Sequence, residues 1–138
     1  MQRFSPVVTD KDTADFFAAA AEHRLVVKSC EACGRAIHPP TAHCPACGSW
    51  STGWREVSGR GQLYSWTTVW HQVHPAYPVP YTIVVVELQD APGVRLVGRM
   101  PDEAQLRAGM PMSVFFERTD DGVVLPNWQP VTGEALQS

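Results

Sequence analysis

The sequence has 138 residues, of which 44% are hydrophobic and 18% are charged, and its formal net charge is −3. That balance is typical of a globular domain with its own core rather than a disordered chain, and no stretch approaches the ~20 apolar residues of a membrane-spanning helix. The twelve prolines and ten glycines predict many turns, which argues against an all-helical bundle. Residues 56–138 hold five arginines and nine acidic side chains, the wrong sign for binding nucleic-acid phosphates.

Residues 9–24 are predicted to form a single helix. Acidic side chains crowd its start, where they oppose the positive end of the helix dipole, and Asp12 or Thr9 would be the N-cap. Phenylalanines and alanines spaced four residues apart give the helix an apolar stripe, so we expect it to be docked on another surface. Residues 25–27 then form a short strand that leads into the first cysteine.

All four cysteines fall within residues 30–47, in two Cys-x2-Cys pairs that are each followed by glycine. Two thiolates separated by two residues can face one point, and two such pairs supply the tetrahedral shell of a structural zinc site. A glycine after each pair suits the tight turn that aims backbone amides at the sulfurs. The predicted zinc ligands are Cys30, Cys33, Cys44 and Cys47.

Two other uses of these cysteines compete with zinc. Paired disulfides would need an oxidising compartment, but the N-terminal residues MQRFSPVVTDKD lack the apolar segment of a secretory signal, which favours the cytoplasm. A redox Cys-x2-Cys motif usually occurs once, on a helix after a strand. This chain has two such motifs, each in a turn that ends in glycine, which argues against a redox role. Four thiolates leave no position for water or substrate, so we expect one structural zinc per chain. His38 and His43 are then expected to be turn residues.

The composition of the chain changes near residues 59–61, and the segment that follows contains five candidate strands with turns between them. Gly98 is expected to mark a bulge or a close approach, and residues 119–122 carry an Asp-Gly hairpin signal. Five short strands suggest a small closed barrel, because closure removes exposed edges. The predicted strands are residues 62–71, 81–88, 94–100, 111–118 and 123–128.

Strict alternation along residues 62–71 would place Tyr64, Trp66 and Trp70 on one strand face. Tyr77 and Tyr81 bracket the end of the loop that follows. Such aromatic residues can stack bases on an oligonucleotide-binding barrel, line a core, or form a protein interface. The acidic sign of this half of the chain makes base stacking the weakest of the three.

No self-sufficient active site is evident in the sequence. Nucleophile-elbow, phosphate-loop, dinucleotide and His-Glu-x-x-His motifs are all missing, and a metal would occupy every cysteine. His71 and His74 are available as acid or base, but no carboxylate or serine is evidently placed with them, so we expect ordinary loop residues. Glu87, inside an apolar run, must find a partner for its charge, and we expect it at a strand end or a sheet edge.

The order of these motifs is similar to that of a known family. The motifs that carry the resemblance are CEACG, Pro39-Pro40, CPACG, SGRG at 58–61, Tyr64, Thr67-Thr68-Val69, Pro80-Tyr81 and Trp128-Gln129-Pro130. Over residues 12–131 they resemble the zinc-ribbon/OB-fold proteins called acyl-CoA-associated, the DUF35 type of domain of unknown function. Thr41 departs from the pattern, since arginine often follows the two prolines in this family.

The resemblance implies a mainly β fold with an N-terminal helix, a rubredoxin-like zinc ribbon and a five-stranded OB-type barrel. The helix and lead strand would take residues 1–28, the ribbon 29–58 and the OB-fold domain 59–138. It also implies a cytoplasmic accessory subunit, not catalytic alone, that docks on a thiolase-like enzyme: an acetyltransferase, a lipid-transfer-protein-type thiolase or an aldolase. There the chain would help to form an acyl-CoA channel, with the catalytic residues on the partner.

Two groups of residues are expected to serve that role. The wall of the interface or channel would be formed by Trp66, Trp70, Tyr77 and Tyr81. An acyl-CoA phosphate would be met by Arg60, Arg95 or Arg99. Other functions stay open: a single-stranded nucleic-acid-binding OB module, a binding module for another acyl-CoA enzyme such as a hydratase, or an autonomous enzyme that uses His71 or His74.

Overall fold

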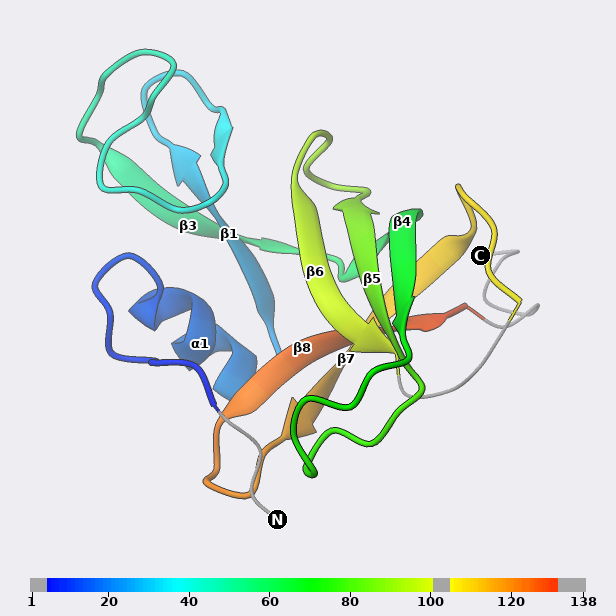
Figure 1. Ribbon diagram of the computed structural model, residues 1–138. Helices are drawn as coiled ribbons and strands as arrows, with labels where there is room; N and C mark the ends of the chain where they lie inside the picture. Colours follow the sequence, from blue (N-terminus) through cyan, green and yellow to red (C-terminus); the bar gives the residue numbers. More distant parts are fainter. Residues whose placement is uncertain (1–4, 101–104, 132–138) are drawn as a thin grey trace.

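The computed structural model describes residues 5–100 and 105–131, so the outer ends of the predicted 1–28 and 59–138 regions lie outside the described residues. The described part is mainly β, as predicted, with one helix and two antiparallel sheets (Figure 1). Within it, no helix has the length and apolar character needed to cross a membrane. The elements are α1 (Ala14–Ala21), β1 (Leu25–Cys30), β2 (Ala36–Ile37), β3 (Thr52–Val57), β4 (Arg60–Val69), β5 (Tyr81–Leu88), β6 (Arg95–Met100), β7 (Pro111–Arg118) and β8 (Val124–Pro130).

The helix α1 begins later than predicted, and both predicted N-caps are wrong. Thr13 is the N-cap and makes no side-chain hydrogen bond there. Asp10 instead builds a turn before the helix: its carbonyl oxygen accepts the N–H groups of Thr13 and Ala14 at 3.1 and 2.7 Å, and its Oδ1 accepts that of Asp12 at 2.8 Å. An aspartate that bonds the backbone two residues on favours a turn over a helix, which explains the late start.

His23 marks the end of α1. Its φ of 59° is in the left-handed region, a common way to end a helix. The N–H of His23 donates to the carbonyl oxygen of Ala20 and that of Arg24 to Ala19, each at 2.9 Å. The imidazole stacks on Phe116 with ring centroids 5.2 Å apart, so the turn between α1 and β1 is packed on β7.

The first sheet has the strand order β2-β1-β3 and carries the cysteine loops. Leu25 and Val27, in the first half of β1, belong to the hydrophobic core of the barrel. Cys30, the last residue of β1, belongs to a separate small cluster with Ile37 and Cys44. One strand therefore joins both cores, and the boundary predicted between residues 28 and 29 falls inside it.

The second sheet has the strand order β6-β5-β4-β7-β8. Its two edge strands, β6 and β8, lie in contact, but the described residues form no backbone ladder between them. A side chain joins them instead, because Asn127 Oδ1 of β8 accepts the N–H of Arg99 of β6 at 2.9 Å. Arg99 Nη2 also lies 2.9 Å from Glu117 of β7. The barrel, expected to be closed, is thus partly open, as OB folds are.

Trp128 fills the centre of the barrel with a fully buried side chain. It lies against Gly98 of β6, where a Cβ atom would come within 2.6 Å of the indole, so Gly98 is the close approach that the sequence offered as one possibility. The predicted Asp-Gly turn between β7 and β8 is also present. The N–H of Thr119 donates to the carbonyl oxygen of Val123 at 2.8 Å, and Gly122 has a φ of 88°.

A bulge interrupts β4 and changes which side chains share a face. The pairing with β5 shifts between Leu63 and Ser65, which leaves Tyr64 as the extra residue. Beyond a bulge the faces of a strand are exchanged relative to strict alternation, so Trp66 lies opposite the buried Val84 on the core face. Tyr64 is exposed on the outer face. The prediction that Tyr64 and Trp66 share one face is wrong for this reason.

Candidate metal centre and docking surface

The two cysteine pairs sit in matching turns of the chain. In each turn the N–H of the first cysteine, Cys30 or Cys44, donates to the carbonyl oxygen five residues on, at 2.8 and 2.9 Å. The N–H of Gly34 or Gly48 donates back to the carbonyl oxygen of that cysteine, at 2.9 and 2.8 Å. Both glycines have left-handed φ angles, 78° and 77°, which glycine adopts without steric cost. The glycine after each pair has the role predicted for it.

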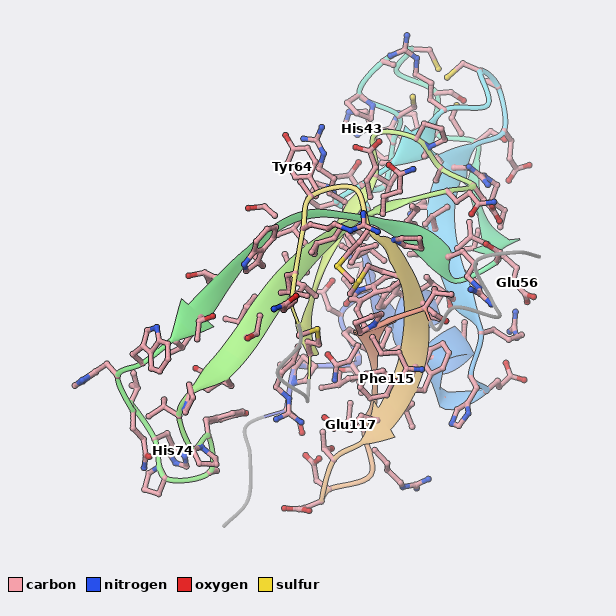
Figure 2. The ribbon with its side chains drawn as sticks, turned by 90° about the vertical axis from the view of Figure 1, so that its right-hand side faces the viewer. His43, Glu56, Tyr64, His74, Phe115 and Glu117 are labelled. Atoms are coloured by element: carbon pink, nitrogen blue, oxygen red, sulfur yellow. The ribbon has the colours of Figure 1, made fainter. Side chains whose placement is uncertain are left out.

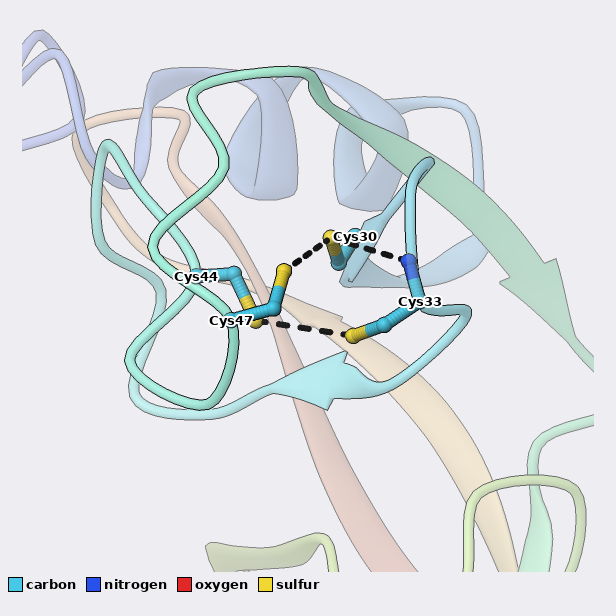
Figure 3. Close-up of side chains that lie close together, drawn as sticks. All are labelled: Cys30, Cys33, Cys44 and Cys47. Carbon is cyan, nitrogen blue, oxygen red and sulfur yellow. Dashed lines mark hydrogen bonds between the residues drawn. The ribbon is translucent and has the colours of Figure 1, made fainter.

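The four sulfur atoms converge on one point (Figure 3). All lie within 4.8 Å of one another, with Cys30 Sγ 3.6 Å from Cys47 Sγ and Cys33 Sγ 3.7 Å from Cys44 Sγ. Tetrahedral zinc with Zn–S bonds of about 2.3 Å holds its sulfurs ~3.8 Å apart. All four cysteines are free of disulfides, so the donor set and its spacing fit a zinc ion.

Backbone amides favour the thiolate form of two of these cysteines. The N–H of Cys33 points at Cys30 Sγ at 3.4 Å, and this hydrogen bond is the largest cause that lowers the pKa of Cys30 to about 6. The amide of Cys47 lowers the pKa of Cys44 in the same way. The amide of Ser49 lowers the pKa of Cys47, but the Cys30 sulfur beside it and burial raise it to about 11. The sulfurs thus compete for the thiolate form, and a bound cation relieves such competition.

The surroundings of the cysteines are those of a structural metal site rather than a catalytic one. Cys30 and Cys44 are buried, and four protein ligands leave no coordination position for a substrate. Among the described residues, neither His38 nor His43 belongs to the group that could hold a metal. His43 instead packs against Trp50, with the rings tilted and their centroids 5.1 Å apart, as suits a turn residue.

The aromatic residues predicted to form an interface do not make one stripe. Trp66 is 39% exposed on the core face of β4, and Trp70, just after β4, is 72% exposed. Tyr77 and Tyr81 do come together, with ring centroids 6.4 Å apart, and His74 lies 6.1 Å from Tyr77. Figure 2 shows the β4–β5 hairpin projecting from the barrel with His74 at its tip. The hairpin therefore presents these aromatic residues at separate places along its length.

Two of the three arginines predicted to meet a phosphate are engaged within the molecule. Arg95 lies over the ring of Tyr64 and forms an ion pair with Glu87 at 3.1 Å. Glu87, one residue before the end of β5, thus finds its partner near a strand end, as expected. Arg99 donates to both carboxylate oxygens of one glutamate of β7 at 3.1 and 2.9 Å. Arg60 makes no ion pair with any described residue, which leaves its charge available to a ligand.

A hollow of about 420 Å³ lies between the loop after β4 and the β7–β8 turn, where OB folds take oligonucleotides. Its charged lining residues are Glu117, Asp120 and Arg118, an acidic balance that repels phosphates. His74, near this hollow, accepts the N–H of Ala76 on its Nδ1 at 3.1 Å and so helps to shape the loop. The nucleic-acid alternative gains no support from this region.

One feature escaped prediction from the sequence: an apolar cleft of about 140 Å³ beside α1. Phe16 and Phe17 of the helix line one side, with Pro40 and Trp54 opposite. Lys28 Nζ lies 5.7 Å above the Trp54 ring. The apolar stripe of the helix indicated the side of this cleft that α1 forms. The opposite side comes from segments far apart in the sequence, which only the fold brings together.

Comparison with solved structures identifies the fold and the family. A chain described as "Ltp2-ChsH2(DUF35) aldolase" is 35% identical to this protein, with a TM-score of 0.84, and the match covers 92% of this chain and 100% of that one. This protein belongs to the ChsH2/DUF35 family. Family models described as the ChsH2 rubredoxin-like zinc ribbon domain and the ChsH2 C-terminal OB-fold domain match residues 17–50 and 54–117. A DUF35 protein from Sulfolobus solfataricus, 16% identical with a TM-score of 0.59, covers 77% of this chain and 78% of its own and shares the fold.

Curated relatives of this DUF35 chain include subunits of larger enzymes. A probable enoyl-CoA hydratase alpha subunit of Thermomonospora curvata is 37% identical over 88% of this chain and 38% of its own length. A 3-oxo-4,17-pregnadiene-20-carboxyl-CoA hydratase alpha subunit of Mycobacterium tuberculosis is 29% identical over 87% of this chain and 36% of its own. A DUF35 domain-containing scaffold protein of Pyrococcus furiosus is 29% identical over 75% and 79%. The chain therefore spans little more than a third of each hydratase subunit.

Proposed function

We propose that this protein is a non-catalytic accessory subunit that docks on a thiolase-fold aldolase and helps to form its acyl-CoA channel. The observation that carries the proposal is the match, over 92% of this chain and 100% of the other, to a chain solved in an aldolase complex. The side chains of the molecule favour an accessory role: its cysteines converge in one cluster, and three of its five histidines, His23, His43 and His74, serve turns and packing. The reacting groups then belong to the partner.

The metal in this proposal is a structural Zn²⁺ held by Cys30, Cys33, Cys44 and Cys47, one per chain. Thiolate donors at tetrahedral spacing prefer zinc over hard cations. When bound, the ion supplies folding free energy to a lobe whose own hydrophobic cluster is small. Because a thiolate site persists only where thiols stay reduced, the proposed location is the cytoplasm.

The acyl-CoA contact is proposed for the exposed hairpin and its neighbouring arginines. Trp70 just after β4, with Tyr77 in the loop and Tyr81 at the start of β5, offers an apolar wall to a pantetheine or acyl chain. Arg60, which forms no ion pair with a described residue, offers its guanidinium for a phosphate. Trp66, on the core face of β4, would extend this wall. Arg95 and Arg99 would hold the shape of the neighbouring sheet through their ion pairs.

A second candidate partner is an acyl-CoA hydratase. Two relatives are named as hydratase alpha subunits, and each is much longer than this chain. In that case the same zinc ribbon and barrel would dock on a hydratase in place of an aldolase. Both partners act on acyl-CoA thioesters, so the ligand class is unchanged.

Co-expression decides between these partners. The tagged full-length chain is expressed with an Ltp2-type aldolase in one culture and with an enoyl-CoA hydratase in another, and each complex is measured by light scattering and zinc quantification. We expect an equimolar complex with the aldolase and about one zinc per chain. A complex with the hydratase alone would shift the function to the second candidate. Zinc without either complex would contradict the accessory role.

A further inference from the structure

The strand β4 has a free edge along its outer half. Its pairing with β7 stops at Gln62, after which Leu63 donates to the carbonyl oxygen of Met110 at 2.9 Å and accepts the N–H of Gly109 at 2.8 Å. Residues 64–69 lie beyond these contacts and, among the described residues, are paired with β5 alone. Figure 2 shows this part of the hairpin standing clear of β7, the strand that carries Phe115 and Glu117.

Apart from the bulge at Tyr64, this edge lacks the side-chain features that protect natural edge strands. Such strands are usually guarded by lysine, proline or an inward charge, which prevents pairing with another chain. Residues 61–86 contain no Asp, Glu, Lys or Arg, and residues 64–69 contain no proline. Beyond the strand, Trp70 and Val73 are 72% and 85% exposed. An exposed, uncharged edge of this kind is a template for pairing with a strand of another chain.

We propose that residues 64–69 of β4 dock by β-strand addition, with an extended, uncharged edge strand of the aldolase as the occupant. The inference rests on the proposed function and specifies its mode of docking. Backbone N–H and C=O groups of the edge would supply the bonds, as in other cases of strand addition. A charged strand would bury its charges against these uncharged residues without a partner, so the absence of charge from residues 64–69 selects an uncharged one. The opposite edge, β6, already contacts β8.

Two matched lysine substitutions distinguish docking at the edge from docking on the sheet face. Thr67→Lys places a charge on the free edge, whereas Val97→Lys places one on the same outer face but on β6, two strands away, at a residue that is 66% exposed. In the full chain with the Ltp2-type aldolase, we expect Thr67→Lys to raise Kd at least about tenfold and Val97→Lys to change it less than about twofold. Equal losses, or no loss in Thr67→Lys, would overturn strand addition. Failure of the unaltered chain to bind would instead remove the proposed function together with this inference.

A crosslink identifies the occupant directly and does not depend on stability. A photoreactive phenylalanine at position 67 of the full chain is irradiated in the complex, and the captured peptide is sequenced. The expected product is an extended, charge-free strand at a sheet edge of the aldolase. Capture of a helix, of a charged segment or of a second copy of this chain would overturn the proposal.

Discussion

Gly98 lies directly against the indole of Trp128, so that a Cβ atom at residue 98 would meet Cδ1 at 2.6 Å and Nε1 at 3.2 Å. Gly98 belongs to β6 and Trp128 to β8, and no backbone ladder joins these two edge strands among the described residues. The indole is fully buried and cannot swing aside as a flexible surface side chain would. The contact between the two edges therefore requires the absence of a side chain at this position.

The substitution Gly98→Ala should lower the free energy of unfolding by about 1–3 kcal/mol, the usual cost of overpacking a core. Chemical denaturation of the zinc-loaded protein measures the change. Val97→Ala, at the exposed neighbouring residue, is the control and should stay within about 0.5 kcal/mol of the unaltered protein. Unchanged or increased stability in Gly98→Ala would contradict the role given to this contact.

The substitution Cys44→Ser should abolish stoichiometric zinc binding and lower the melting temperature. Cys44 is fully buried, and a serine hydroxyl is not a thiolate ligand. Zinc is quantified in the purified protein, and the unaltered protein treated with a chelator should melt at the same lower temperature. Ser49→Ala, in the same turn, should keep its zinc. Full zinc content in Cys44→Ser would show that the four sulfurs are not a metal centre.

The turn between β7 and β8 should show a defined dependence on pH. The hydroxyl of Thr119, and then that of Ser5 at 2.7 Å, hold the pKa of Asp121 below its ordinary value of 3.8. A pKa lowered by folding means that the ionised carboxylate stabilises the native state above pH 3.8 and that this contribution is lost as the pH falls through the lower folded value. Thr119→Ala should raise the pKa of Asp121, measured by NMR titration of its carboxyl carbon. Thr41→Ala, a threonine of the ribbon, should leave it unchanged, and equal behaviour of both variants would refute the assignment.

Two exposed tryptophans offer a matched test of the docking surface. Trp70 at the end of β4 is 72% exposed, and Trp50 in the ribbon is 74% exposed. Trp70→Ala should weaken the complex with the aldolase about tenfold or more, as removal of an aromatic anchor does, while zinc content stays the same. Trp50→Ala should bind as the unaltered chain does. The reverse order, measured by titration calorimetry, would move the interface from the hairpin to the ribbon.

The cluster of four cysteines could be predicted from the sequence because its determinants are local. Each turn needs only two cysteines and the glycine that follows them, and both turns have the predicted form. The first residue of α1 could not be predicted from the sequence in this way. Asp10 can serve a helix as an acidic first-turn residue or a turn as an acceptor, and its hydrogen bonds to residues 12–14 decide the competition.

The outer surface of the barrel was harder to predict because it depends on strand register. The extra residue Tyr64 appears only when β4 is aligned with β5, and nothing in its own sequence distinguishes it from a regular strand residue. Arg95 meets Glu87 across neighbouring strands, a pairing that also follows from register. Side chains that look free in the sequence are therefore already used in the fold.

The strand β1 has a consequence for how such proteins can be recombined. Leu25 and Val27 are core residues of the barrel, whereas Cys30 on the same strand is one of the clustered cysteines. A chimera that took residues 29–58 from a relative would import the cysteines but would divide β1 between the two proteins. Leu25 would then come from this protein, whereas its strand partner Val57 would come from the relative. A crossover before residue 25 and another after residue 57 keeps the strand and its pairing whole. The ribbon can thus be exchanged as one unit only when the exchanged segment includes the strand residues at its two ends, which lie in the core of the barrel.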